Sequence, residues 1–151
     1  MSEKAIKLLA SGFGSGLTPI APGTAGTVVG ILLCLLCLPL PWVPRLLVVL
    51  ALSALSVYVS GKAEKIYGKK DDQRIVIDEI TGFQVTMLPV AITGWHLCLA
   101  FVLFRIFDIW KPFPVNNLQQ LPGGWGVVMD DVAAGIYAGL LMLLLTLLVK
   151  F

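Results

Sequence analysis

The sequence predicts an all-α protein, a polytopic membrane helical bundle with about three full spans, a short helical hairpin and an N-terminal amphipathic helix. Its mean hydropathy of +0.91 and its apolar content of 58% lie above those of an ordinary soluble domain. Four long stretches of the chain carry no Asp, Glu, Lys or Arg. Because a membrane-spanning helix needs about 20 mostly apolar residues, these stretches are predicted to lie in a bilayer. The chain, residues 1–151, is expected to form one membrane-embedded domain.

The N-terminal half is predicted to hold the amphipathic helix and two of the spans. Residues 3–10 follow an amphipathic helical pattern and are expected to lie on the membrane surface. The Gly- and Pro-rich stretch after them is expected to be an ordered loop. The two spans cover about residues 24–38 and about residues 44–65, and a Pro-rich break separates them. Trp42, in that break, is typical of a membrane interface.

Residues 78–110 allow two interpretations. One long span would place acidic residues at opposite faces of the membrane. Pro89 and Gly94 interrupt the run near its middle, however, and favour two helices, 78–91 and 95–110, that form a hairpin. Each arm would be about 20–24 Å long, which is short for a hydrocarbon core of about 30 Å. The hairpin is preferred because it brings the acidic ends of both arms to the same side.

The third full span is predicted to begin near Met129–Asp130 and to run to about Val149. Its first residues would then suit the positive end of the helix dipole. The polar segment 61–74 holds the densest group of basic residues, so the positive-inside rule places it in the cytoplasm. The net charge of +2 is too small to suggest nucleic acid as a partner.

Five of the nine acidic residues lie at the ends of strongly apolar segments: Asp78, Glu79, Asp108, Asp130 and Asp131. Charge at the edge of a membrane segment is costly and usually functional, and clustered carboxylates suit a hard divalent cation. Either adjacent pair alone can be ordinary helix N-terminal charge. Neighbouring side chains on a helix also diverge by about 100°, so such a pair rarely holds one ion without help. Two pairs and a fifth carboxylate together favour a metal site at a membrane surface.

Basic and small residues extend this predicted site. Arg105, Asp108 and Lys111 share one helical face. They are either a local ion pair at the interface or an Asp ligand beside cations that meet phosphate. Gly23 and Thr24 open the first span, where free backbone N–H groups favour an anion, although Gly-Thr before a helix is also ordinary capping.

Four ordered blocks of the sequence resemble the phosphatidylglycerophosphatase A family: GFGSGLTPIAPGTAGT, IVIDEITG, FRIFDIWKPFP and GGWGVVMDDVAAGIYAG. They extend from Gly12 to Gly139, nearly the whole chain. The resemblance implies a Mg²⁺-dependent phosphatase that converts phosphatidylglycerophosphate to phosphatidylglycerol and phosphate in glycerophospholipid biosynthesis. It also implies a multi-pass protein of the bacterial cytoplasmic (inner) membrane, with its active site facing the cytoplasm.

The resemblance further implies roles for individual residues. Its motif positions fall on Gly23, Thr24, Asp78, Glu79, Gly82, Arg105, Asp108, Lys111, Pro112, Asp130, Asp131 and Gly135. The expected Mg²⁺ ligands are Asp78, Glu79, Asp108, Asp130 and Asp131. The expected catalytic residues are Asp78, Glu79, Arg105, Asp108, Lys111 and Asp131. The expected phosphate-binding residues are Gly23, Thr24, Arg105 and Lys111.

Two points stay open at this stage. Some family members have Asp-Pro before the second block, where this chain has Asp71–Asp72, so both residues are left outside the predicted site. The nucleophile is expected to be a metal-activated water, with an Asp as the other candidate.

An alternative function is a small cation or proton transporter, or a channel subunit, that uses intramembrane carboxylates. A transporter would place its acids at mid-membrane. The acids of this chain lie at segment ends, which favours catalysis at the membrane surface. The oligomeric state is left open.

Overall fold

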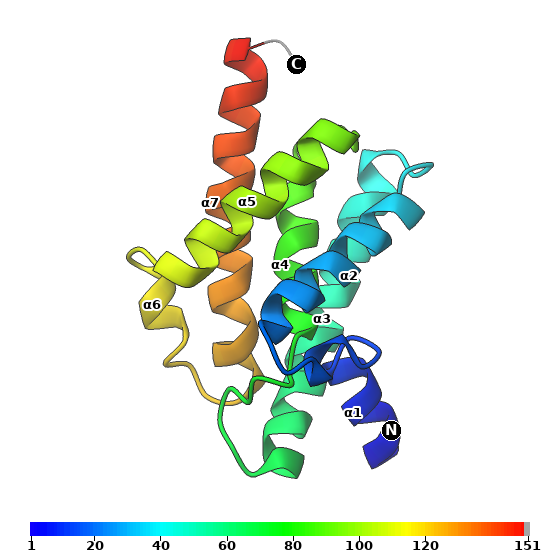
Figure 1. Ribbon diagram of the computed structural model, residues 1–151, viewed down its shortest axis with the longest axis vertical. Helices are drawn as coiled ribbons and strands as arrows, with labels where there is room; N and C mark the ends of the chain where they lie inside the picture. Colours follow the sequence, from blue (N-terminus) through cyan, green and yellow to red (C-terminus); the bar gives the residue numbers. More distant parts are fainter. Residues whose placement is uncertain (150–151) are drawn as a thin grey trace.

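The computed structural model describes residues 1–149, and that part of the chain is all-helical, without strands (Figure 1). The all-α prediction is therefore confirmed. In chain order the helices are α1 Glu3–Ala10, the 3₁₀ helix η1 Ser15–Leu17, α2 Pro22–Leu36, α3 Trp42–Tyr67, α4 Ile77–Met87, α5 Gly94–Trp110, α6 Val115–Leu118 and α7 Gly124–Val149.

The short helix α4 lies at the centre of the bundle and packs against α2, α3, α5 and α7 (Figure 1). Nearly all of its residues are buried. Phe83 and Met87 enter the main apolar core together with Phe104 of α5 and Met142 of α7. A helix that is buried on every side needs a partner on every side, so α4 is held in place by the whole bundle.

Two glycines allow α4 and α7 to approach closely. A Cβ atom added at Gly82 would lie 2.7 Å from the backbone oxygen of Asp131 and 2.6 Å from the ring of Phe104. A Cβ atom added at Gly135 would meet the backbone oxygen of Gly82. Small residues let helix backbones meet in this way. The contact sets the first turn of α4 beside Asp131.

The N-terminal helix α1 has the predicted bounds and packs against the C-terminal half of α3. Its Ile6 and Ala10 are buried in a second apolar cluster with Val59 and Ala63 of α3. The apolar face of α1 therefore packs on protein, whereas its lysines stay exposed.

Within residues 1–149, helices α3 and α7 are the two that are long and apolar enough to cross a membrane. Helix α2 is apolar but has 15 residues, so only two of the three predicted full spans reach the length of a span. The predicted hairpin corresponds to α4 and α5. Helix α4 ends four residues early, because Pro89 lacks a backbone N–H to continue it.

The prediction for the start of the last helix was wrong. Helix α7 begins at Gly124, so Asp130 and Asp131 lie about two turns inside it rather than at its N-terminus. A side chain at Gly124 would collide with the backbone oxygen of Val57 on α3. Packing against α3 thus supports the early turns of α7 in a Gly-rich segment that resembles a loop in sequence.

Candidate metal centre and phosphate pocket

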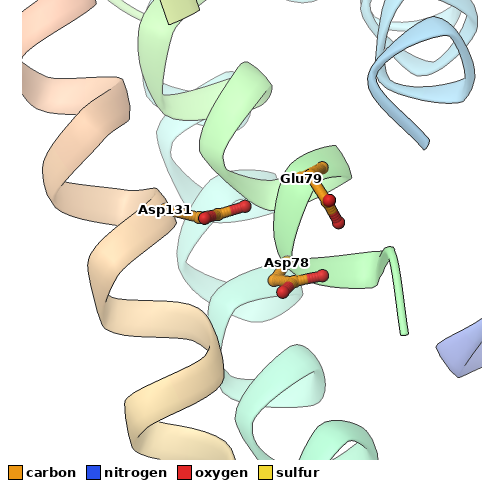
Figure 2. Close-up of side chains that lie close together, drawn as sticks. All are labelled: Asp78, Glu79 and Asp131. Atoms are coloured by element: carbon orange, nitrogen blue, oxygen red, sulfur yellow. The ribbon is translucent and has the colours of Figure 1, made fainter. Parts of the chain in front are cut away.

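Three carboxylates from two helices converge at the first turn of α4 (Figure 2). Asp78, Glu79 and Asp131 each offer one oxygen, and these oxygens lie within 4.8 Å of one another. Each residue also has a buried oxygen without a hydrogen-bond partner: Asp78 Oδ1, Glu79 Oε2 and Asp131 Oδ2. An unpaired buried carboxylate oxygen is costly, and a hard cation that takes oxygen ligands would satisfy it. The cluster therefore fits a divalent metal ion.

The neighbours Asp78 and Glu79 meet at one point despite their separation around the helix. Figure 2 shows Asp131 pointing from α7 toward both α4 carboxylates. Asp131 of α7 thus supplies the third carboxylate that lets the adjacent pair Asp78 and Glu79 share one ion. Sequence spacing alone does not contain this information, because Asp131 lies more than 50 positions farther along the chain.

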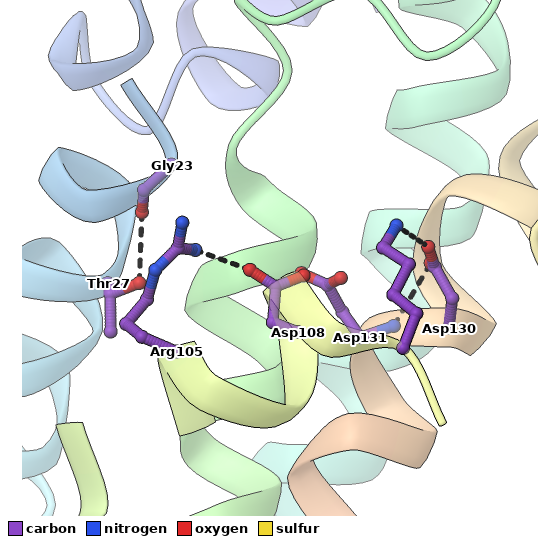
Figure 3. A network of polar contacts seen from close by, with 7 residues as sticks. Gly23, Thr27, Arg105, Asp108, Asp130 and Asp131 are labelled. Atoms are coloured by element: carbon purple, nitrogen blue, oxygen red, sulfur yellow. Dashed lines mark hydrogen bonds and ion pairs between the residues drawn. The ribbon is translucent and has the colours of Figure 1, made fainter. Parts of the chain in front are cut away.

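Two ion pairs flank the cluster (Figure 3). Arg105 Nη1 lies 2.5 Å from Asp108 Oδ2, and Lys111 Nζ lies 2.6 Å from Asp130 Oδ2. Asp108 therefore pairs with Arg105 rather than with Lys111. The reason is that α5 ends at Trp110, and the backbone of Lys111 turns to a positive φ of 46°. This turn directs the Lys111 side chain away from the α5 face, and Lys111 pairs with Asp130 of α7 instead.

A pocket of about 420 Å³ joins the cluster to both ion pairs. All five predicted acids, both predicted cations and Gly23 line it. With Asp71, which also lines it, six carboxylates face two basic groups, and the pocket is acidic in the absence of a metal ion. A phosphate dianion would be repelled from such a pocket unless a cation entered with it.

Helix α2 brings its first turn to the rim of this pocket. A Cβ atom at Gly23 would meet Glu79 Oε1 and would lie 3.2 Å from Arg105 Nη1, so a side chain there would displace the carboxylate of Glu79. The Thr27 hydroxyl donates to the Gly23 carbonyl at 2.9 Å (Figure 3). Thr24, predicted to bind phosphate beside Gly23, is not among the lining residues in the part of the chain that the structure describes.

Sequence reasoning missed several residues of the pocket wall. They are Pro19, Ala21 and Pro22 before and at the start of α2, and Asp71, Gln73 and Ile75 before α4. Asp71 accepts a hydrogen bond from Gln119 Nε2 at 2.8 Å, whereas Asp72 pairs with Arg74 Nε at 2.7 Å outside the pocket. Of the two acids left outside the predicted site, Asp71 lines the pocket and Asp72 is not among its lining residues. Proximity to Asp78 in sequence was the one available signal.

Burial changes the proton affinity of the site residues that lie outside α3 and α7. It raises the pKa of Glu79 to about 7. Burial also raises the pKa of Asp78 well above its usual range, and the charges on Glu79 and Asp131 add to this effect. For Lys111, burial lowers the pKa, but the hydrogen bond and the charge of Asp130 outweigh it and raise the pKa overall. Lys111 is therefore a fixed cation at the pocket.

Relatives of known name share nearly the whole chain. Proteins named phosphatidylglycerophosphatase A from Escherichia coli K12 and Haemophilus influenzae are 41% and 42% identical to it. The alignments cover 89% and 88% of this chain and 80% and 83% of those proteins. A Bacteroides thetaiotaomicron relative with the provisional name phosphatidylinositol-3-phosphatase is 40% identical over 89% of both chains. No solved structure matches significantly.

The family comparison agrees with these relatives. The model of the family described as phosphatidylglycerophosphatase A matches residues 8–146 of this chain. This range contains every residue of the pocket described above. The match and the identities together show that the chain belongs to the phosphatidylglycerophosphatase A family of phosphatases.

Proposed function

We propose that this protein is a Mg²⁺-dependent phosphatase that hydrolyses phosphatidylglycerophosphate to phosphatidylglycerol and phosphate in glycerophospholipid biosynthesis. Family membership and the names of two relatives support this reaction. The observation that carries the metal dependence is the cluster of Asp78, Glu79 and Asp131, whose unpaired oxygens lie beside two cations. Family membership also favours this enzyme over the transporter alternative, which no specific observation supports.

Asp78, Glu79 and Asp131 would hold the ion. Bound there, Mg²⁺ supplies positive charge between the carboxylates and the phosphate, polarises the phosphoryl oxygens and activates a water. Asp108 and Asp130 pair with Arg105 and Lys111, and we assign them the role of orienting these cations. That Asp108 and Asp130 are also metal ligands stays a prediction.

The basic residues and the start of α2 would bind the phosphate. Arg105 presents a planar fork of N–H donors that matches phosphate oxygens, and Lys111 adds a point charge. Both would offset charge that develops on the phosphoryl group and on the leaving oxygen. The first backbone N–H groups of α2 would add an anion site at Gly23, and Thr24 stays a predicted part of it. We propose a water as the nucleophile.

We also propose that the whole chain is one multi-pass domain of a bacterial cytoplasmic membrane. Trp42 lies at the start of α3. Arg45 of the same helix donates to the Met87 carbonyl at the end of α4, so Trp42 lies at the end of the bundle that holds the turn between α4 and α5. Trp95, in the first turn of α5, lies near this end too. Trp110 and Trp125 lie at the pocket end. All four are more than half exposed, as expected of interfacial belts. This arrangement supports a third span by α2 and an embedded α4–α5 hairpin.

The distribution of positive charge supports a cytoplasmic pocket. Lysines and arginines gather at the pocket end of the bundle, in α1, in the last turns of α3 and in the segment before α4. Cytoplasmic segments carry such an excess. The phosphate pocket would then open at the headgroup level of the inner leaflet, while the acyl chains of the substrate stay in the bilayer.

Phosphate release from phosphatidylglycerophosphate by the purified protein in detergent tests the proposal. Release is expected with Mg²⁺ and not with EDTA. Asp131→Asn should lower turnover on the order of 100-fold or more, because it removes a metal-binding oxygen. Asp72→Asn is the matched control, since Asp72 is also buried but lies outside the pocket, and it should keep its activity. Equal release with Mg²⁺ and EDTA would refute the metal dependence.

A further inference from the structure

One apolar face of α5, next to the polar pocket, forms a shallow, open groove of about 630 Å³. Its lining residues are Phe101, Val102, Arg105, Ile106, Ile109 and Trp110. Arg105 also lines the polar pocket and, among the described residues, is the one common to the two linings. The two cavities therefore adjoin at Arg105.

Arg105 suits a boundary between polar and apolar surroundings. Its guanidinium pairs with Asp108 in the polar pocket (Figure 3). The aliphatic stem of an arginine can cover apolar surface while its charged end stays with polar groups. A ligand with a phosphate and an adjoining hydrocarbon chain would thus meet matching surfaces on the two sides of this residue.

The groove itself has the chemistry of a hydrocarbon site. Apart from Arg105, every side chain that lines it is apolar. Ile109 and Trp110 at its pocket end are 72% and 71% exposed. No helix of the described chain covers these two side chains, so their apolar surface is available to a ligand that extends out of the pocket.

We propose that the groove on α5 holds an acyl chain of the lipid whose phosphate occupies the polar pocket. The groove would thereby select lipid phosphomonoesters over water-soluble ones. The inference rests on the proposed function, because it takes the polar pocket as the phosphate site. It adds a position for the acyl chain and a reason why lipid phosphomonoesters would be preferred over water-soluble ones.

A matched pair of isoleucines tests the groove. Ile106 in the groove and Ile136 on α7 are both 49% exposed, and Ile136 lines a separate apolar groove that contains no residue of the polar pocket. The substrates are phosphatidylglycerophosphate in detergent and its deacylated, water-soluble head group. Ile106→Ser should lower kcat/KM about tenfold for the lipid and leave that for the head group unchanged. Ile136→Ser should change neither.

The ratio of the two kcat/KM values decides the matter. If Ile106→Ser and Ile136→Ser keep the same ratio between lipid and head group as the unsubstituted protein, the groove does not hold the chain. An equal loss on both substrates for Ile106→Ser would also overturn the inference, because it would indicate damage to the pocket itself.

A binding experiment separates this inference from the reaction. The probe is phosphatidic acid with a photoreactive group in one acyl chain, compared in the presence of Mg²⁺ with phosphatidylcholine that carries the same chain. Adducts of phosphatidic acid should concentrate on residues 101–110, whereas those of phosphatidylcholine should spread over other exposed faces. Equal distributions for the two lipids would show an ordinary bilayer-facing surface. Absence of phosphate release together with concentrated adducts would refute the proposed function and keep the groove.

Discussion

Glu79 illustrates how neighbours decide what an acidic residue does. Burial and the charge of Asp108 raise its pKa, and the result, about 7, lies within the physiological range. The metal-free pocket therefore holds a proton that a metal ion must displace. The binding of the ion and the binding of the proton are coupled at this residue.

The sign of this coupling gives a pH prediction for the metal-free protein. The unfolded chain releases the Glu79 proton near 4.5, but the folded protein keeps it to about 7. The folded state thus binds more protons between these values, and the free energy of unfolding should fall as pH rises through this window. In EDTA, Tm should be lower at about pH 8 than at about pH 5.5. Glu79→Gln should reduce this difference.

Mg²⁺ should show the opposite trend. Its affinity should weaken by up to about tenfold for each pH unit below about 7, as measured by titration of the ion into the detergent-solubilised protein. An affinity that does not change between about pH 6 and about pH 8 would contradict the role of Glu79 as a ligand.

At the scale of elements, the contact between α4 and α7 positions the carboxylate cluster. Gly82 and Gly135 let the two backbones meet, and Asp131 lies one turn before Gly135 on α7. Any increase in the distance between these helices would move Asp131 away from Asp78 and Glu79. The metal site therefore depends on two residues that have no functional group.

Substitution of Gly135 tests this dependence. Alanine is the better helix former by roughly 0.5–1 kcal/mol, so a loss must come from the contact with the Gly82 carbonyl. Gly135→Ala should destabilise the protein by about 1–3 kcal/mol and weaken Mg²⁺ binding. Gly94→Ala is the control, since a Cβ atom there meets nothing within 4 Å. Equal Tm and equal Mg²⁺ affinity of the two variants would refute the argument.

Element ends were predictable where local signals define them. Thr93 accepts a hydrogen bond from His96 N as the N-cap of α5, and Pro112 follows its last turn, so the predicted bounds of this helix are right to within one residue. The start of α7 was missed because packing on α3 stabilises it, and because Gly123, the residue before it, has no side chain that could cap the helix. Local capping is visible in a sequence, whereas packing on a distant helix is not.

At the scale of the whole molecule, the two ends of the bundle differ in chemistry. The pocket and most of the basic residues lie at one end. The turn between α4 and α5 lies at the other end, where Arg45 of α3 donates to the carbonyls of Met87 and Val90. A membrane that encloses the α4–α5 hairpin should therefore separate this turn from the segment before α4.

Cysteine accessibility tests this orientation. After replacement of Cys34, Cys37 and Cys98, single cysteines are introduced at two exposed positions, Ala91 in the turn and Lys70 before α4. In sealed spheroplasts a membrane-impermeant maleimide should label Ala91→Cys and not Lys70→Cys. Inverted vesicles should show the reverse. Labelling of both positions from the same side would refute the embedded hairpin.

The sequence by itself determined the helical class, the limits of α1 and α5, and the residue types of the site, because composition, capping and hydrophobic period are local properties. Only the tertiary structure decided which of these residues meet. It joined Asp78 and Glu79 to Asp131, and it paired Lys111 with Asp130 of α7. The physical reason is that contacts between helices depend on their separation and rotation, which the close approach of Gly82 and Gly135 sets here.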